Sequence, residues 1–156
     1  MNDRFCLRLL TPADLPEIWR VRHAVQENRL APDHTITVAD VIERMAPPGR
    51  GWGVELPGGK LAGFAIACGA REGADAGRIW ALFVHPDHAA QGHGRRLHDE
   101  MVGWLRGQGL TRLWLNTQRG SRAETFYRLS GWVDCGPRAD GHDDETRFEL
   151  PLTTAP

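Results

Sequence analysis

The most informative segment of the chain is Val84-His85-Pro86-Asp87-His88-Ala89-Ala90-Gln91-Gly92-His93-Gly94-Arg95-Arg96-Leu97, in which an apolar stretch passes through a glycine-rich turn into a helical pattern. The first amide groups of a helix have no intrahelical acceptor and carry the positive end of the helix dipole. Gly92 and Gly94 lack the Cβ atoms that would keep a phosphate away from those amides. We therefore predict that this turn binds a phosphate or pyrophosphate. A Gly-x-Gly pair alone is equally typical of a tight turn between a strand and a helix, so the surrounding sequence has to decide.

The segments on either side of this turn predict a strand and a helix. Residues 79–84 (Ile-Trp-Ala-Leu-Phe-Val) form a continuous apolar run, which predicts a central strand buried on both faces. After Gly94 the apolar residues follow the spacing of one helix face, and they are Leu97, Met101, Trp104 and Leu105. Gly107 ends this pattern.

Apolar patterns and turn signals predict the remaining elements. Further strands are expected at residues 5–10, 51–56, 61–67, 113–116, 132–135 and 147–150, and further helices at residues 11–28, 38–45 and 121–131. The order strand-helix-helix-strand-strand-strand-helix-strand-helix-strand-strand predicts an α/β fold with a mixed central sheet of about seven strands. Since the chain has 156 residues and no linker-like tract, we expect a single domain over residues 1–156.

The composition excludes several classes of protein. The chain is 41% hydrophobic and 25% charged, as is typical of a globular domain, and its net charge of -1 gives no field that favours nucleic acid or an anionic membrane. No apolar run approaches the roughly 18 residues that span a bilayer. Asp3 and Arg4 stand where a signal peptide would be apolar. We therefore expect a cytoplasmic protein with neither a nucleic-acid nor a membrane partner.

The cysteines and histidines lack the spacing of a metal site. The three cysteines are far apart and odd in number: Cys6, Cys68 and Cys135. Four histidines are spread over a strand end, a turn and a helix without a pair on one helix face: His85, His88, His93 and His98. We predict no bound metal. Together with Arg95 and Arg96, these histidines would raise the positive potential around phosphates.

The glycine-rich turn resembles the acetyl-CoA loop of the GNAT acyltransferase superfamily. Two nucleotide-binding patterns fail, because the chain has no Gly-Lys-Ser/Thr and no third glycine followed by an acidic ribose partner. The GNAT pattern is Arg/Gln-x-x-Gly-x-Gly/Ala, and Gly92 and Gly94 match its two small positions. Ala89 stands at the first position, where it lacks the usual side-chain contact.

A second block carries the same resemblance. The segment Gly120-Ser121-Arg122-Ala123-Glu124-Thr125-Phe126-Tyr127-Arg128-Leu129-Ser130-Gly131-Trp132 resembles the family's Asn-x-x-Ala-x-x-Phe-Tyr-x-x-x-Gly-Phe/Trp, with Gly120 where Asn is usual. The order of the predicted elements also matches that of the superfamily, so the resemblance covers nearly the whole chain.

The resemblance implies a binding site for acetyl-CoA as co-substrate. The fourth and fifth strands would splay apart, pantetheine would lie in the gap, and a backbone amide near Phe83 or Val84 would stabilise the oxyanion. The residues implied in binding the coenzyme are Leu82, Phe83, Val84, Ala89, Ala90, Gln91, Gly92, His93, Gly94, Arg95, Ser121, Ala123 and Phe126.

The same resemblance implies an acid and leaves the base open. Tyr127, the single tyrosine, stands where the family places the residue that gives its proton to the coenzyme thiolate, although periodicity alone is also compatible with a core tyrosine. Many relatives carry a glutamate on the fourth strand, whereas this chain has Arg78, Trp80 and Leu82 there. His85 is a candidate base, with a turn residue and a water chain as the alternatives.

Residues of the first predicted helix are candidates for the acceptor site. Arg22 falls on the apolar stripe of that helix, in the region from which relatives build their acceptor pocket. Arg22 is a candidate for binding a substrate carboxylate, and Glu27 for attracting an ammonium group or relaying a proton. Both are equally compatible with a structural salt bridge or cap. Asn28 and Trp80 complete the predicted acceptor site.

We therefore expect an N-acetyltransferase that moves an acetyl group from acetyl-CoA to a primary amine of a small molecule by direct attack. The alternatives are a non-catalytic acyl-CoA-binding module and an acetyltransferase that acts on a peptide or protein amine. A homodimer is compatible with the resemblance. The sequence does not identify the amine, because acceptor loops vary independently of the coenzyme site.

Overall fold

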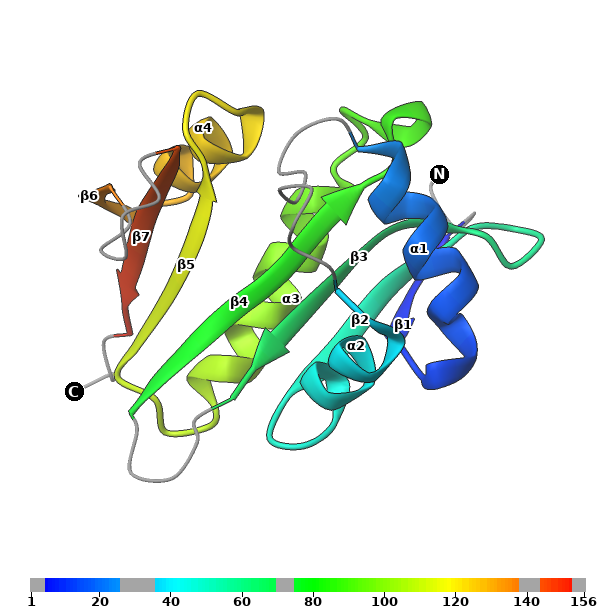
Figure 1. Ribbon diagram of the computed structural model, residues 1–156, viewed down its shortest axis with the longest axis horizontal. Helices are drawn as coiled ribbons and strands as arrows, with labels where there is room; N and C mark the ends of the chain where they lie inside the picture. The colour runs from blue at the N-terminus through cyan, green and yellow to red at the C-terminus, as the bar shows by residue number, and fades with distance from the viewer. Residues whose placement is uncertain (1–4, 26–35, 70–74, 138–143, 153–156) are drawn as a thin grey trace.

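The computed structural model describes residues 5–25, 36–69, 75–137 and 144–152 and has a central sheet of seven strands in the order β1-β2-β3-β4-β5-β7-β6 (Figure 1). The strands are β1 (Cys6–Leu9), β2 (Arg50–Glu55), β3 (Leu61–Cys68), β4 (Ala76–Val84), β5 (Arg112–Gln118), β6 (Val133–Pro137) and β7 (Glu145–Pro151). The helices are α1 (Leu15–Ala24), α2 (Val38–Met45), α3 (His93–Arg106) and α4 (Arg122–Leu129), with short 3₁₀ turns η1 (Pro12–Asp14) and η2 (Pro86–His88). This order confirms the predicted α/β fold with a mixed sheet.

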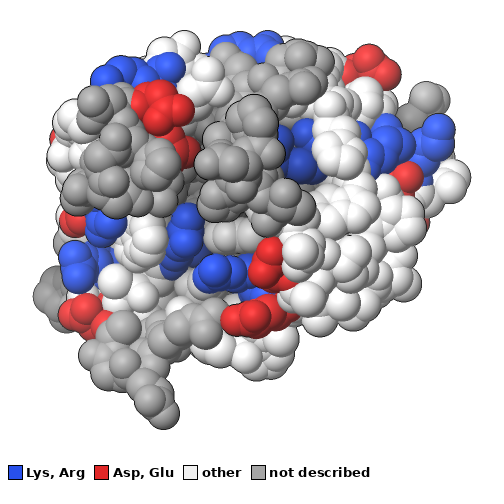
Figure 2. All heavy atoms as spheres, in the orientation of Figure 1, with Lys and Arg blue, Asp and Glu red and all other residues white. Residues whose placement is uncertain are grey.

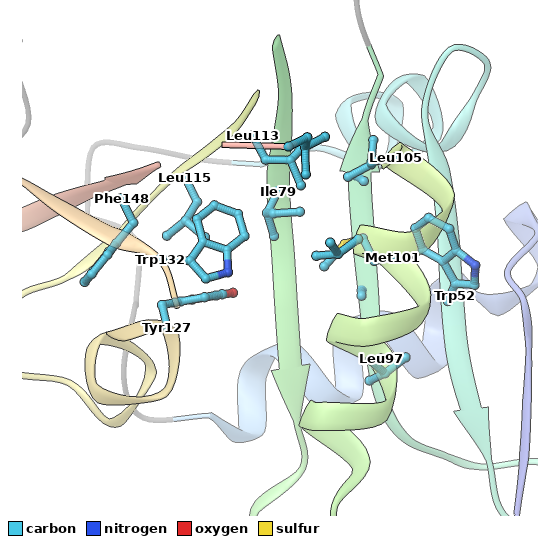
Figure 3. Close-up of a cluster of buried hydrophobic side chains, with 14 of the residues drawn as sticks. Trp52, Ile79, Leu97, Met101, Leu105, Leu113, Leu115, Tyr127, Trp132 and Phe148 are labelled. Carbon is cyan, nitrogen blue, oxygen red and sulfur yellow. The ribbon is translucent and has the colours of Figure 1, made fainter. Parts of the chain in front are cut away.

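Helices cover both faces of the sheet. Helices α1 and α2 lie on one face over β2 to β4, and α3 lies on the other face (Figure 1). Two groups of buried side chains follow from this arrangement. One includes Phe64 and Ile66 under α1 and α2, and the other includes Leu97, Met101 and Phe148 on the α3 side (Figure 3). No helix in the described ranges is long and apolar enough to cross a membrane.

Helix α2 begins at a capping box, in which a side chain and a backbone amide exchange hydrogen bonds. The hydroxyl of Thr37 accepts from the N–H of Asp40 at 3.1 Å, and the carboxylate of Asp40 accepts from the N–H of Thr37 at 2.8 Å. Thr11 caps η1 in the same way, and α1 then ends at Ala24, with Val25 extended. The helix predicted to reach about residue 28 is therefore shorter, and residues 26–28 lie outside the described part.

The prediction that residues 79–84 are buried on both faces is wrong. In β4 only Gly77, Ile79 and Ala81 are buried and the other positions are half-buried, whereas every residue of β3 is buried. A bulge contributes, because Ile79 pairs with Ala67 and Ala81 pairs with Ile66, which leaves Trp80 as an extra residue. The loss of the neighbouring strand beyond Arg78 contributes as well.

Candidate active site

The site is organised by the separation of β4 from β5. The two strands are parallel, and they pair only from Ala76 to Arg78 on β4 and from Arg112 to Trp114 on β5. Beyond these residues they diverge, while β5 stays paired with β7 along its whole length (Figure 1). The C-terminal half of β4 therefore presents one backbone edge that no described strand covers.

The glycine-rich turn lies at the end of β4 and leads into α3. Gly92 is the N-cap of α3 with a φ of 85°, and it has no side chain with which to cap the helix amides. Ala90 also has a positive φ, 61°. A Cβ added at Gly92 would meet nothing within 4 Å, and one added at Gly94 would meet only Val84 Cγ2 at 3.7 Å. The glycines thus border open space at the positive end of a helix, an arrangement that suits a phosphate.

Most side chains of this turn are exposed, and that of His93 is the buried exception. The ring of His93 is buried, lies edge-on to Phe5 at 4.8 Å, and has hydrogen-bond contacts with Gln91 Oε1 and with an Arg96 guanidinium nitrogen, both at 3.3 Å. Burial and the nearby charge of Arg96 lower the pKa of His93. The His93 ring is therefore turned away from a bound anion, and only the backbone amide of His93 is placed to contact one. Arg95 is exposed, with its guanidinium 5.3 Å from the centre of the Phe126 ring.

The uncovered backbone edge of β4 can be assigned residue by residue. The N–H of His85 donates to the carbonyl oxygen of Ala62, at 2.8 Å, on the β3 side. Because successive N–H groups of a strand point to opposite sides, the N–H of Val84 points toward the diverging β5. The geometry therefore favours Val84 over Phe83 as the residue whose amide faces the opening.

The sequence left two roles open for His85, a turn residue or a base, and the structure shows that it is a turn residue. Its Nδ1 accepts a hydrogen bond from the N–H of Asp87, at 3.0 Å, and so caps η2. Strand β4, which precedes His85, contains neither Asp nor Glu.

Tyr127 extends from α4 toward β4 (Figure 3). Its ring packs in the interior against Trp132 and Phe148, and the residue is only 5% exposed. Within the described part of the chain its hydroxyl has no hydrogen-bond partner. Burial raises the pKa of the Tyr127 phenol well above its ordinary value, so the group keeps its proton at neutral pH. A neutral buried phenol is suited to donate a proton, and not to accept one.

A histidine that the sequence placed with the phosphate-binding residues instead supports Tyr127. Nε2 of His98 accepts from the indole N–H of Trp132 at 3.0 Å, and Nδ1 lies 2.9 Å from Asp99 Oδ1. The His98 ring lies 6.4 Å from the Tyr127 ring. His98 precedes Val102 and Leu105 at i+4 and i+7 on α3, and this spacing was the one sequence signal for an inward-facing side chain.

The start of α4 is held by its own side chains. The Ser121 hydroxyl donates to the carbonyl oxygen of Gln118 at 2.6 Å and accepts from the N–H of Glu124 at 3.2 Å, so it serves as the helix cap. The carboxylate of Glu124 accepts from the Thr146 hydroxyl at 2.6 Å and from the N–H of Gly120 at 3.2 Å. Ala123, one turn before Phe126 and Tyr127, is half-buried.

The predicted acceptor residues are brought together only in part. The Arg22 guanidinium lies over the ring of Phe83, 4.4 Å from its centre, and so connects α1 to the C-terminal half of β4. Trp80 lies on the same face, with the Arg44 guanidinium 5.6 Å from its ring centre. Glu27 and Asn28 lie outside the described residues.

Sequence reasoning missed a group on β5. Two guanidinium groups contact the Trp114 ring, that of Arg78 at 4.7 Å and that of Arg147 at 4.5 Å from the ring centroid. Asn116 follows Trp114 on the same face of β5, since Leu113 and Leu115 point into the core on the α3 side. Basic side chains are visible on the face that carries α1 and α2, with acidic side chains beside them (Figure 2). No sequence pattern marks this group, because it depends on which strands pair.

The four histidines do not form one cluster. His85 and His88 lie near each other, at 6.1 Å between ring centres, whereas His93 and His98 are buried in different contacts. Within the described ranges, no three side chains of His, Cys, Asp or Glu come together as metal ligands would.

Comparison with known proteins agrees with this architecture. Residues 15–132 match the family described as "Acetyltransferase (GNAT) family". The chain is 28% identical over 102 residues to the [ribosomal protein bS18]-alanine N-acetyltransferase of Escherichia coli strain K12, a match that covers 61% of this chain and 67% of that protein.

Solved structures share the fold. The ribosomal-protein-S18-alanine N-acetyltransferase from Escherichia coli superposes with a TM-score of 0.75 at 22% identity, over 97% of this chain and 96% of that chain. Nourseothricin acetyltransferase superposes with a TM-score of 0.70 at 20% identity, over 96% of this chain and 99% of that chain. The family match extends from α1 to Trp132 and so includes the glycine-rich turn, both diverging strands and α4; the chain belongs to the GNAT family of acetyltransferases.

Proposed function

We propose that this enzyme transfers an acetyl group from acetyl-CoA to a primary amine of a small molecule. The observation that carries the proposal is the separation of β4 from β5 directly beside the N-terminus of α3. The uncovered β4 edge suits an extended ligand with amide groups, and the open space at Gly92 and Gly94 suits its phosphates. Pantetheine and pyrophosphate occur together in this order in coenzyme A.

The residues around the opening support direct transfer. The amine nitrogen attacks the thioester carbonyl carbon, the C–N bond forms and the C–S bond breaks. The N–H of Val84 donates to the carbonyl oxygen as negative charge develops on it. Tyr127 gives its proton to the departing thiolate, and the proton released by the attacking nitrogen passes to water or to His85.

The acceptor side supports an amine that also carries an anionic group. Arg22 and Arg44 lie over Phe83 and Trp80 on the face of β4 where the acceptor would enter. Arg22 would pair with a carboxylate of the substrate. Glu27, Asn28 and a homodimer remain predictions.

A peptide or protein amine is the second candidate for the acceptor. It is favoured by the similarity to the Escherichia coli enzyme, which by its name acts on an alanine of a ribosomal protein. The two candidates differ in what must enter the opening: a free small amine, or the first residues of an extended chain.

A turnover assay tests the proposal and separates the candidates. The purified protein is given acetyl-CoA with putrescine, tyramine, β-alanine, L-glutamate or an alanine-initiated hexapeptide, and the released thiol and the mass of the product are measured. Steady release with a small amine and a product heavier by one acetyl group is the expected result. Turnover with the hexapeptide alone would favour the peptide acceptor. Binding of acetyl-CoA without release for any amine would instead favour the non-catalytic binding module.

A further inference from the structure

The side-chain oxygen of Asn116 is buried without a partner at the point where the two strands separate. Asn116 is two residues beyond Trp114, the last residue of β5 that pairs with β4. Its Oδ1 is inaccessible to solvent, and no described residue donates a hydrogen bond to it. Buried carbonyl oxygens in folded proteins are nearly always paired, so an exception calls for a physical reason.

One neighbouring donor, opposite Asn116 in the strand register, is engaged elsewhere. Arg147 on β7 pairs directly with Asn116 in the strand register. Its Nε and Nη2, however, lie 3.1 and 3.0 Å from Glu149 Oε2, and its guanidinium lies over the Trp114 ring. The ion pair with Glu149 and the stacking on Trp114 therefore hold this donor away from Asn116.

The position of the oxygen indicates what could satisfy it. It lies on the face that carries Arg22 and Trp80, from which the acceptor would enter, and not on the face of α3. Any group that binds there and reaches the thioester must bring its nitrogen past the diverging ends of β4 and β5. Because Oδ1 is closed to solvent in this structure, the Asn116 side chain must turn toward the opening when such a nitrogen binds. An amine nitrogen carries N–H donors, which a buried amide oxygen accepts.

We propose that Asn116 Oδ1 accepts a hydrogen bond from the attacking nitrogen of the acceptor and so orients it toward the thioester. This inference rests on the proposed acetyl transfer. A neutral oxygen suits the role because, unlike a carboxylate, it does not favour the charged ammonium form, so the lone pair needed for attack stays available. Asn116 is thus a substrate-contacting residue that holds the nitrogen and takes no proton.

Three variants test this role. Asn116→Leu removes the oxygen with little change in size, Asn116→Asp keeps an oxygen at the same place, and Gln118→Leu puts the same apolar side chain at the next position on this face of β5. Each amine of the panel above is titrated by calorimetry into the protein saturated with CoA, which has no acetyl group to transfer. Turnover with acetyl-CoA and the melting temperature are measured in parallel.

We expect Asn116→Leu to raise the dissociation constant and the KM of the amine about tenfold and to leave acetyl-CoA affinity unchanged. Asn116→Asp should restore amine binding to within about threefold, and Gln118→Leu should behave as wild type. The melting temperature of Asn116→Leu should not fall, because no hydrogen bond of the folded chain is lost.

Other outcomes distinguish a failure of the Asn116 role from a failure of the proposed acetyl transfer. Equal amine binding by wild type and Asn116→Leu would overturn the role of Asn116 and leave the proposed acetyl transfer standing. A lower melting temperature of Asn116→Leu with unchanged amine binding would show that Asn116 is structural. Amine binding that depends on Asn116 but leads to no turnover would overturn the acetyl transfer alone. No amine binding by the wild type would overturn both.

Discussion

The indole N–H of Trp132 donates to Nε2 of His98 across 3.0 Å inside the protein, and this bond fixes the charge state of the histidine. A nitrogen that accepts a hydrogen bond carries no proton, so the His98 proton is on Nδ1, 2.9 Å from Asp99 Oδ1. The ring is therefore neutral. Because Trp132 packs on Tyr127 at 5.5 Å, the bond also fixes one side of the pocket around the phenol.

This bond predicts how stability depends on pH. Burial lowers the pKa of His98 below its ordinary value of about 6.5. Between the two pKa values the unfolded chain therefore binds a proton at His98 and the folded chain does not. The free energy of unfolding has its full value above the unfolded-state pKa of His98, and it decreases as the pH falls from there to the folded-state pKa. Urea unfolding at pH 7.5 and 5.5 should show the loss in wild type and a smaller loss in His98→Gln.

A control is needed because the pKa of His93 is also lowered, and His93 contributes with the same sign. The difference between wild type and His98→Gln in this pH-dependent loss of unfolding free energy gives the contribution of His98. His98→Ala should in addition cost about 1–3 kcal/mol at pH 7.5, since it leaves the Trp132 N–H unpaired. Equal pH dependence in wild type and His98→Gln would contradict the assigned protonation state.

Gly94→Val should abolish most of the stabilisation by acetyl-CoA. A ligand at about 100 times its dissociation constant adds roughly 2.7 kcal/mol to folding stability. The added Cβ would meet only Val84 Cγ2, at 3.7 Å, so the folded chain tolerates the start of the side chain while the branched methyl groups occupy the space proposed for phosphate. The melting temperature with and without acetyl-CoA measures the effect.

Gly103→Val is the matched control for this experiment. Gly103 lies on the same helix, is exposed, and an added Cβ there meets nothing within 4 Å. This variant should keep the full shift with acetyl-CoA. If Gly94→Val kept it as well, the turn would not be the phosphate site.

The elements that the sequence predicted best are those set by local interactions. Residues 38–45 were predicted to the residue, because the Thr37 and Asp40 capping box and the apolar spacing are adjacent in the chain. The burial of residues 79–84 was predicted wrongly, because it depends on where β5 departs and on the bulge at Trp80. Neither the departure of β5 nor the bulge can be predicted from a run of apolar residues.

The candidate site divides in the same way. Gly92, Gly94 and Tyr127 belong to motifs of contiguous sequence and were predicted from those motifs. The surroundings of Asn116 depend on strand register with Arg147, 31 residues away. Those of His98 depend on its contact with Trp132, 34 residues away. A single sequence carries no signal for such pairs.

Arg22→Met should raise the KM of the amine while leaving acetyl-CoA affinity nearly intact. The variant keeps the apolar contact with Phe83 and removes the charge that would pair with a substrate carboxylate. We expect roughly a tenfold effect, typical of one charged hydrogen bond, and a similar change in Glu27→Gln if Glu27 attracts the ammonium group. Steady-state kinetics with each substrate varied in turn measures both.

Lys60→Met serves as the control for lost charge, because Lys60 is exposed on the turn between β2 and β3. It should leave both KM values unchanged. Parallel losses of amine and coenzyme affinity in Arg22→Met, together with a lower melting temperature, would assign Arg22 to the structure of α1.

Tyr127→Phe should lower kcat by about 10² while preserving the fold and acetyl-CoA binding. The phenyl ring keeps the contacts with Trp132 and Phe148, and removal of the hydroxyl breaks no hydrogen bond to a described residue. The effect belongs at the low end of the range for proton transfer, because a thiolate is already a fair leaving group.

Since burial raises the pKa of the phenol above its ordinary value, Tyr127 itself should cause no fall in rate up to about pH 10. In the variant, protonation of the thiolate must come from water, so the rate should become more sensitive to the leaving group. A series of acetyl thioesters with thiols of different pKa, assayed with wild type and variant, measures that sensitivity. Wild-type kcat and an equal dependence on thiol pKa in the variant would assign Tyr127 to the core.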